Sequence, residues 1–161
     1  MSDLPSVSSS LDQLKQEIIQ LRRGKRRGHY RPHKLVMLLA VIDLADRGIL
    51  EENRILLSDP LLRTFENIFL LVKRKDDLCQ PGPPFFHLRS SGFWFHKVRP
   101  GREEGYSKLT TTGGGLQIID HYIEYAYLRD DVYQLIQDPA SRRELRLLIS
   151  RLLNATEENN D

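Results

Sequence analysis

The sequence predicts a mainly helical α+β fold in a single domain, with a small antiparallel β-hairpin or sheet. Three observations lead to this prediction. Apolar residues recur at helical spacing in most of the chain, an aromatic segment at 85–98 has the pattern of short strands, and 161 residues with 40% hydrophobic side chains suffice for one core. A compact second domain would hardly fit.

The N-terminal part of the chain predicts two helices. Residues 1–9 are expected to form a disordered tail, and apolar residues at helical spacing then predict an amphipathic helix that runs from residue 11 to Gly24. Pro32 suits the first turn of the next helix, which spans about 33–46. This second helix is apolar almost all round, so we expect it to be the central helix of the core.

The middle of the chain predicts one more helix and then strands. A short strand at 54–57 precedes a helix over 61–73, which follows the start signal Ser-Asp-Pro at 58–60. The segment FFHLRSSGFWFHKV at 85–98 predicts two aromatic strands joined by a turn at Ser90, Ser91 and Gly92. A hairpin after a set of helices is winged-helix-like in part.

The last third of the chain returns to helical spacing. Residues 99–115 predict a flexible loop with a possible strand at 106–109. The sequence then predicts helices over 116–128, 130–137 and 139–153, the last of them capped by Asp138 and Pro139. Residues 154–161 form a polar, acidic tail.

Positive charge is concentrated in one stretch of the sequence. Residues 20–34, QLRRGKRRGHYRPHK, contain seven Lys and Arg residues and two His without a carboxylate, although the net charge of the whole chain is only +2. Because this stretch leads directly into the predicted core helix, its last residues would hold cationic groups on a fixed scaffold, as suits contact with a polyanion. The competing interpretation is a solvated arm, above all for Arg22 to Arg27.

Enzyme and metal chemistry receive little support from the sequence. The five His residues lack zinc-site spacing, and the lone Cys79 excludes an internal disulfide and a multi-cysteine metal site. No phosphate-cradling loop and no nucleophile elbow is present, and Glu103 and Glu104 are a poor carboxylate pair. We therefore expect no catalytic residue, no metal and no cofactor. The chain has no apolar run of about 20 residues and no secretory signal, which predicts a cytoplasmic protein without a membrane partner.

Two segments together resemble a known family. The His-Lys dipeptide that opens HKLVMLLAVIDL, combined with the Pro-Phe segment PPFFHLRSSGFW, is similar to the sulfur-binding domain that recognises phosphorothioate-modified DNA. That domain often occurs beside an HNH nuclease in modification-dependent restriction enzymes. The resemblance covers roughly residues 29–153, so that residues 10–153 would form a sulfur-binding-like DNA recognition domain.

The resemblance implies where a modified phosphate would bind. In that family the sulfur enters a shallow apolar cavity near the Pro-Phe segment, while basic residues at the head of the core helix hold the backbone and neighbouring bases. Carried over, Pro83 and Pro84 would line the cavity, His87 would lie at its margin, and His33 and Lys34 would contact DNA. Charge placement adds further candidates for backbone or base contacts: Arg26, Arg27, Arg31, Arg89 and Lys97. Ser90, at the predicted turn, is a further candidate.

The predicted function is a DNA-binding module that recognises phosphorothioated double-stranded DNA without catalysis in this chain. Any nuclease activity would come from a fused or partner domain, that is, from an effector in trans. Three alternatives stay open. They are a general or methylated-base DNA reader without sulfur selectivity, a nuclease with an unrecognised active site, and a protein-interaction module whose basic patch meets an acidic partner.

Overall fold

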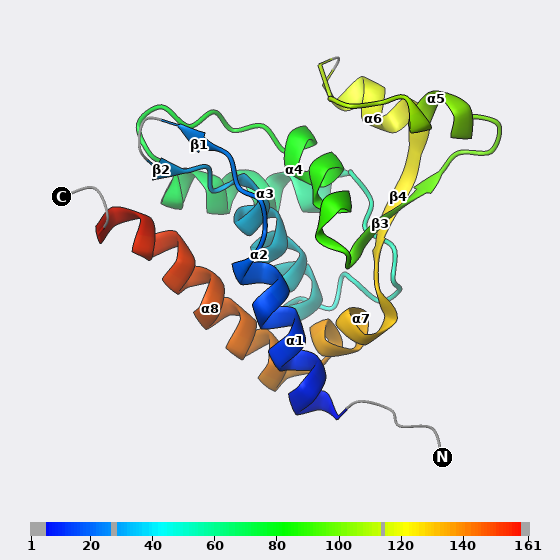
Figure 1. The fold of residues 1–161 in the computed structure, drawn as a ribbon. Coiled ribbons are helices and arrows are strands. Elements are labelled where there is room, and N and C mark those ends of the chain that lie inside the picture. Colours follow the sequence, from blue (N-terminus) through cyan, green and yellow to red (C-terminus); the bar gives the residue numbers. More distant parts are fainter. Residues whose placement is uncertain (1–5, 27–28, 114, 159–161) are drawn as a thin grey trace.

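The central element of the fold is the helix α2, His33–Asp46. The computed structural model describes residues 6–26, 29–113 and 115–158. Four side chains of α2, Leu35, Val36, Met37 and Ala40, are completely buried, because apolar residues occupy nearly every face of this helix. Figure 1 shows α2 enclosed by other helices.

Four longer helices pack around α2. They are α1 (Val7–Ile19), α3 (Asp59–Val72), α7 (Asp130–Gln137) and α8 (Pro139–Glu158). Proline lies in the first turn of α3, where its missing N–H costs nothing. Asp138 caps α8, since its Oδ2 accepts hydrogen bonds from the backbone N and the Oγ of Ser141 at 3.0 and 2.6 Å.

Two small antiparallel sheets complete the regular structure. β3 (Trp94–Val98) pairs with β4 (Ile123–Leu128), so that Trp94 lies opposite Leu128, and Ile55 forms an isolated bridge to Ala126. β1 (Lys25–Arg26) pairs with β2 (His29–Tyr30). The connections contain four short helical segments: α4 (Gly82–His87), the 3-10 turn η1 (Leu88–Ser91), α5 (Glu103–Ser107) and α6 (Leu116–Tyr122).

The structure confirms the predicted class, a mainly helical α+β domain with a small antiparallel sheet. The helices expected at 33–46 and 130–137 have the predicted bounds, and the helix expected at 61–73 begins slightly earlier, at Asp59. One continuous hydrophobic core joins the helices and the β3–β4 sheet.

The predicted hairpin at 85–98 is wrong. Its first half forms α4 and η1, and only the second half is a strand, which pairs with the distant β4. Pro83 and Pro84 lie in the first turn of α4, where proline is well tolerated. Phe85 and Phe86 are almost fully buried, so this aromatic run reflects a core-facing turn of helix and not an alternating strand.

The strand β4 was predicted as the end of a helix over 116–128. Its residues IEYAYL are β-branched and aromatic in part, and the sheet partner β3 outweighs their helical spacing. The strand expected at 106–109 is also wrong, because α5 ends at Ser107 and Leu109 lies in a loop. At 54–57 only the single bridge of Ile55 forms.

Both predicted tails are shorter than expected. Residues 7–9 belong to α1, which begins one residue after Ser6, and the Ser6 hydroxyl accepts a hydrogen bond from the backbone N of Ser9 at 3.1 Å. Residues 154–158 continue α8. The remaining parts of the two predicted tails, 1–5 and 159–161, lie outside the described residues.

Candidate anion-binding site

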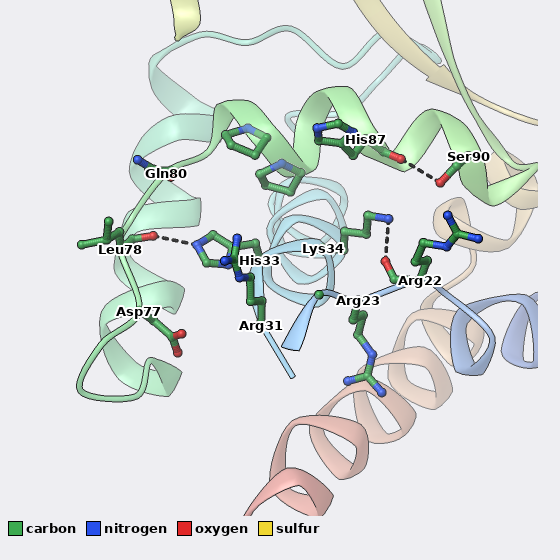
Figure 2. Close-up of a pocket in the computed structure, with 13 residues that line it drawn as sticks. Arg22, Arg23, Arg31, His33, Lys34, Asp77, Leu78, Gln80, His87 and Ser90 are labelled. Atoms are coloured by element: carbon green, nitrogen blue, oxygen red, sulfur yellow. Dashed lines mark hydrogen bonds between the residues drawn. The ribbon is translucent and has the colours of Figure 1, made fainter. Parts of the chain in front are cut away.

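A pocket of about 420 Å³ opens at the N-terminal end of α2. Figure 2 shows it between α4 on one side and the segment that precedes α2 on the other. The lining residues are Arg22, Arg23, Gly24, Arg31, His33, Lys34, Asp77, Leu78, Gln80, Pro83, Pro84, His87 and Ser90. We call this cavity the head pocket.

The first turn of α2 supplies two side chains that are held by backbone carbonyls. Lys34 Nζ donates a hydrogen bond of 2.7 Å to the carbonyl of Arg22, and His33 Nε2 donates one of 2.6 Å to the carbonyl of Leu78. The His33 ring also packs against Phe69, with 4.9 Å between ring centroids. Since α2 is buried along its length, the backbone that carries His33 and Lys34 is held in a fixed position.

The contact with Leu78 fixes the tautomer of His33. A carbonyl can only accept, so Nε2 carries the proton, and burial lowers the pKa of His33 below its ordinary value. The ring is therefore neutral at pH 7. Its other nitrogen, Nδ1, is buried and has no hydrogen-bond partner among the described residues.

The segment before α2 adds guanidinium groups to the head pocket. The backbone N of Arg31 donates to the carbonyl of Gly24 at 2.6 Å, which draws the two ends of the β1–β2 hairpin together. The Arg23 guanidinium lies over the ring of Tyr30, 4.6 Å from its centroid. Burial lowers the pKa of Lys34, because a charged amine is poorly solvated there, and the positive charge of Arg22 lowers it further.

Proline rings form the opposite side of the head pocket. Pro84 is buried and Pro83 half-buried in the first turn of α4. Two ring N–H groups hold this turn, since Trp94 Nε1 and His96 Nε2 each donate to the carbonyl of Phe85 at 2.9 Å. The prolines therefore present a rigid apolar surface without N–H donors.

The carboxylate that lines the head pocket is already engaged. Asp77 is buried, its Oδ1 lies 3.2 Å from His29 Nε2, and its Oδ2 accepts from the backbone N of Arg74 at 2.8 Å. At the other end of the pocket, burial together with the cations Lys34 and Arg89 lowers the pKa of His87. The balance of charge in the pocket is thus positive, which favours an anionic ligand.

The structure brings together most of the residues that the sequence singled out. Those that line the head pocket are Arg31, His33, Lys34, Pro83, Pro84, His87 and Ser90. Arg89 does not line it: its guanidinium lies 4.1 Å from the centroid of the Phe86 ring and donates to the carbonyl of Leu109 at 2.7 Å. Lys97 lies on β3, outside the pocket lining.

Several lining residues were not assigned to the site from the sequence. Arg22 and Arg23 belong to the basic run, for which contact with a polyanion and a solvated arm were both open, and neither was named as a site residue. Arg26 of that run lies in β1, and Arg27 lies outside the described residues. Leu78 and Gln80 carry no sequence signal. They reach the head pocket only because the chain between α3 and α4 folds back over α2.

Metal-binding chemistry finds no support in the part of the chain that the structure describes. No group of three or more His, Cys, Asp or Glu side chains there could hold an ion, and Cys79 is an exposed free thiol.

Among the described helices, none has both the length and the apolar character needed to cross a membrane.

No known protein family matches the sequence, and no curated protein matches it. The class of site is therefore defined by its own geometry: a preorganised cationic pocket with one apolar, donor-free wall.

Proposed function

We propose that this chain is a DNA-binding module that recognises phosphorothioate-modified double-stranded DNA in the cytoplasm. One observation carries the proposal: the head pocket joins a wall of two prolines to the cations Arg31 and Lys34. The resemblance of the His-Lys and Pro-Phe segments to the sulfur-binding domain supports the same assignment. Catalysis would belong to a nuclease or another effector in trans.

The proline wall supplies the discrimination between sulfur and oxygen. A phosphorothioate sulfur is larger and more polarisable than the oxygen it replaces, and it accepts hydrogen bonds poorly. An ordinary phosphate oxygen placed against Pro83 and Pro84 would lose its water and gain no donor, which costs about 1–3 kcal/mol. Sulfur avoids most of this cost, so the wall favours the modified phosphate.

The cations supply affinity that does not depend on sequence. Arg22, Arg31 and Lys34 line the same pocket and can contact the remaining oxygens of the bound phosphate and its neighbours. Lys34 is already held by the Arg22 carbonyl, so little side-chain freedom is lost when DNA binds. Affinity and selectivity thus come from different walls.

Ser90 is the candidate for sequence preference around the modification. Its hydroxyl donates to the carbonyl of His87 at 3.0 Å, and its oxygen can accept a hydrogen bond from an exocyclic amino group of adenine or cytosine in the major groove. His33 lines the same pocket with its ring.

The test is a binding titration of one labelled duplex with and without a single phosphorothioate, each stereoisomer measured separately. We expect one stereoisomer to bind roughly 5- to 150-fold more tightly than the unmodified duplex, as a penalty of about 1–3 kcal/mol implies. Equal affinity for all three duplexes would leave a general DNA reader. Tighter binding to a methylated duplex would identify a base-modification reader, and cleavage in the presence of Mg²⁺ or Mn²⁺ would identify a nuclease.

A further inference from the structure

The solvent face of the β3–β4 sheet carries a set of aromatic rings that the head pocket does not use. On this face Phe95 lies opposite Tyr127, and Lys97 lies opposite Tyr125. The other face, with Trp94, is packed into the core. We call the four residues Phe95, Lys97, Tyr125 and Tyr127 the aromatic face.

The rings of the aromatic face are arranged as a continuous surface. Phe95 and Tyr127 stack with 5.6 Å between centroids and 27° between planes, and Tyr125 meets Tyr127 edge to face at 6.2 Å. Phe95 remains 38% exposed, and Tyr125 and Tyr127 are half-buried, so the rings are partly open to solvent. Partly exposed rings that stack on one another offer an apolar surface for a ligand to contact.

Basic groups lie among these rings. Lys97 is exposed, and the Arg54 guanidinium lies 5.3 Å from the centroid of the Tyr125 ring. Glu52 approaches Arg54 Nε at 3.5 Å and partly neutralises that cation, which leaves Lys97 as the principal positive charge. Stacked rings beside a cation complement a nucleic acid strand, whose bases have π faces and whose backbone is anionic.

We propose that the aromatic face binds unpaired nucleotides of a single-stranded nucleic acid. The bases stack on Phe95 and Tyr127, and Lys97 contacts the backbone. Paired bases in a duplex hide their π faces in the helix stack, so this surface selects single strands where the head pocket would take duplex. An acidic or apolar protein segment is the less favoured occupant, since it would not use the ring faces.

The experiment measures binding of a fluorescein-labelled 12-mer of deoxythymidine to the full chain by fluorescence anisotropy at low salt. Replacement of Phe95 by Leu keeps an apolar side chain and removes the stacking surface. We expect this change to weaken binding roughly 5- to 150-fold, the range for loss of one base–aromatic stack. Tyr127→Phe retains the ring and should bind like the unaltered chain. Lys97→Ala should lower the slope of log K against log salt by about 0.7, the value for one contact to a single strand.

Two controls separate this proposal from the proposed function. Leu71→Ala changes an exposed apolar residue of α3 away from the aromatic face and should leave binding of the 12-mer unchanged. Lys34→Ala changes the head pocket and should weaken duplex binding while sparing the 12-mer. The inference fails if the unaltered chain does not bind the 12-mer. It also fails if Phe95→Leu binds as tightly as the unaltered chain, or if Lys34→Ala abolishes 12-mer binding. None of these outcomes bears on duplex discrimination at the head pocket.

Discussion

Replacement of both prolines of the head pocket by serine is the sharpest perturbation of the proposed sulfur site. Pro83 and Pro84 occupy the first turn of α4, where a backbone N–H has no intrahelical partner in any case. Serine can therefore be accommodated there without breaking a helical hydrogen bond. Each serine adds a backbone N–H and a hydroxyl to a wall of the pocket that otherwise has no donor.

The expected effect follows from the environment of the phosphate oxygen. With prolines, an oxygen against this wall loses about 1–3 kcal/mol of hydration, so the modified duplex binds roughly 5- to 150-fold more tightly than the plain one. With serines, the oxygen regains a donor, and the ratio should fall to about 1. The plain duplex should bind no more weakly than before, because Arg31 and Lys34 are unchanged.

The assay is a competition titration of matched plain and phosphorothioated duplexes, read by fluorescence anisotropy. Pro60→Ser is the matched control, since Pro60 lies in the first turn of α3, is exposed and does not line the head pocket. The control should keep the discrimination of the unaltered chain. If the double variant Pro83→Ser, Pro84→Ser folds and still prefers the modified duplex by the original factor, the proline wall is not the source of selectivity.

Three further predictions concern the cations and the supports of the pocket. Arg31→Ala combined with Lys34→Ala should weaken binding to every duplex. In a titration from about 50 to 200 mM salt, the slope of log K against log salt should fall by about 2, since each lost phosphate contact removes about 0.9. Burial lowers the pKa of His96 to about 4. The neutral ring therefore contributes about 3 kcal/mol to the free energy of unfolding, a contribution that is complete above pH 6.5 and is lost as the pH falls toward 4. Urea unfolding at several pH values should show a smaller pH dependence for His96→Gln. Asp77→Ala removes the acceptor facing His29 and should lower the free energy of unfolding by about 1–3 kcal/mol for each buried group left without its partner, whereas Asp77→Asn should lower it less.

The sequence predicts an element best where the type of that element depends on local residues alone. The helix α2 could be predicted to the residue because apolar side chains cover all its faces and Pro32 precedes it. The strand β4 could not, since IEYAYL suits either a strand or a helix and its pairing with β3 depends on residues about 30 positions away. The segment at 85–98 fails for a related reason. Buried aromatics indicate a core position and leave the type of element open.

The head pocket was predictable in the same uneven way. Its two main walls come from local motifs, the His-Lys pair at the start of α2 and the Pro-Pro pair at the start of α4, and both motifs are visible in the sequence. The lining by Leu78 and Gln80 was not predictable, because these residues reach the pocket through tertiary folding of an irregular segment. The tautomer of His33 depends on one of these residues, because the carbonyl of Leu78 accepts from Nε2, whereas burial of the ring is what lowers its pKa.

The buried position of α2 explains why a weakly charged protein can hold a strongly basic site. Lys34 and His33 are held by carbonyls and partly removed from water, and burial lowers the pKa of both. The pocket therefore places cations where water solvates them poorly and where they repel one another. An anion that enters relieves both effects, and the geometry is already set by α2, so little order has to be created on binding. This favours a ligand whose negative charge fits between Lys34 and Arg31, with one poorly hydrated atom turned toward the prolines, as a phosphorothioate offers.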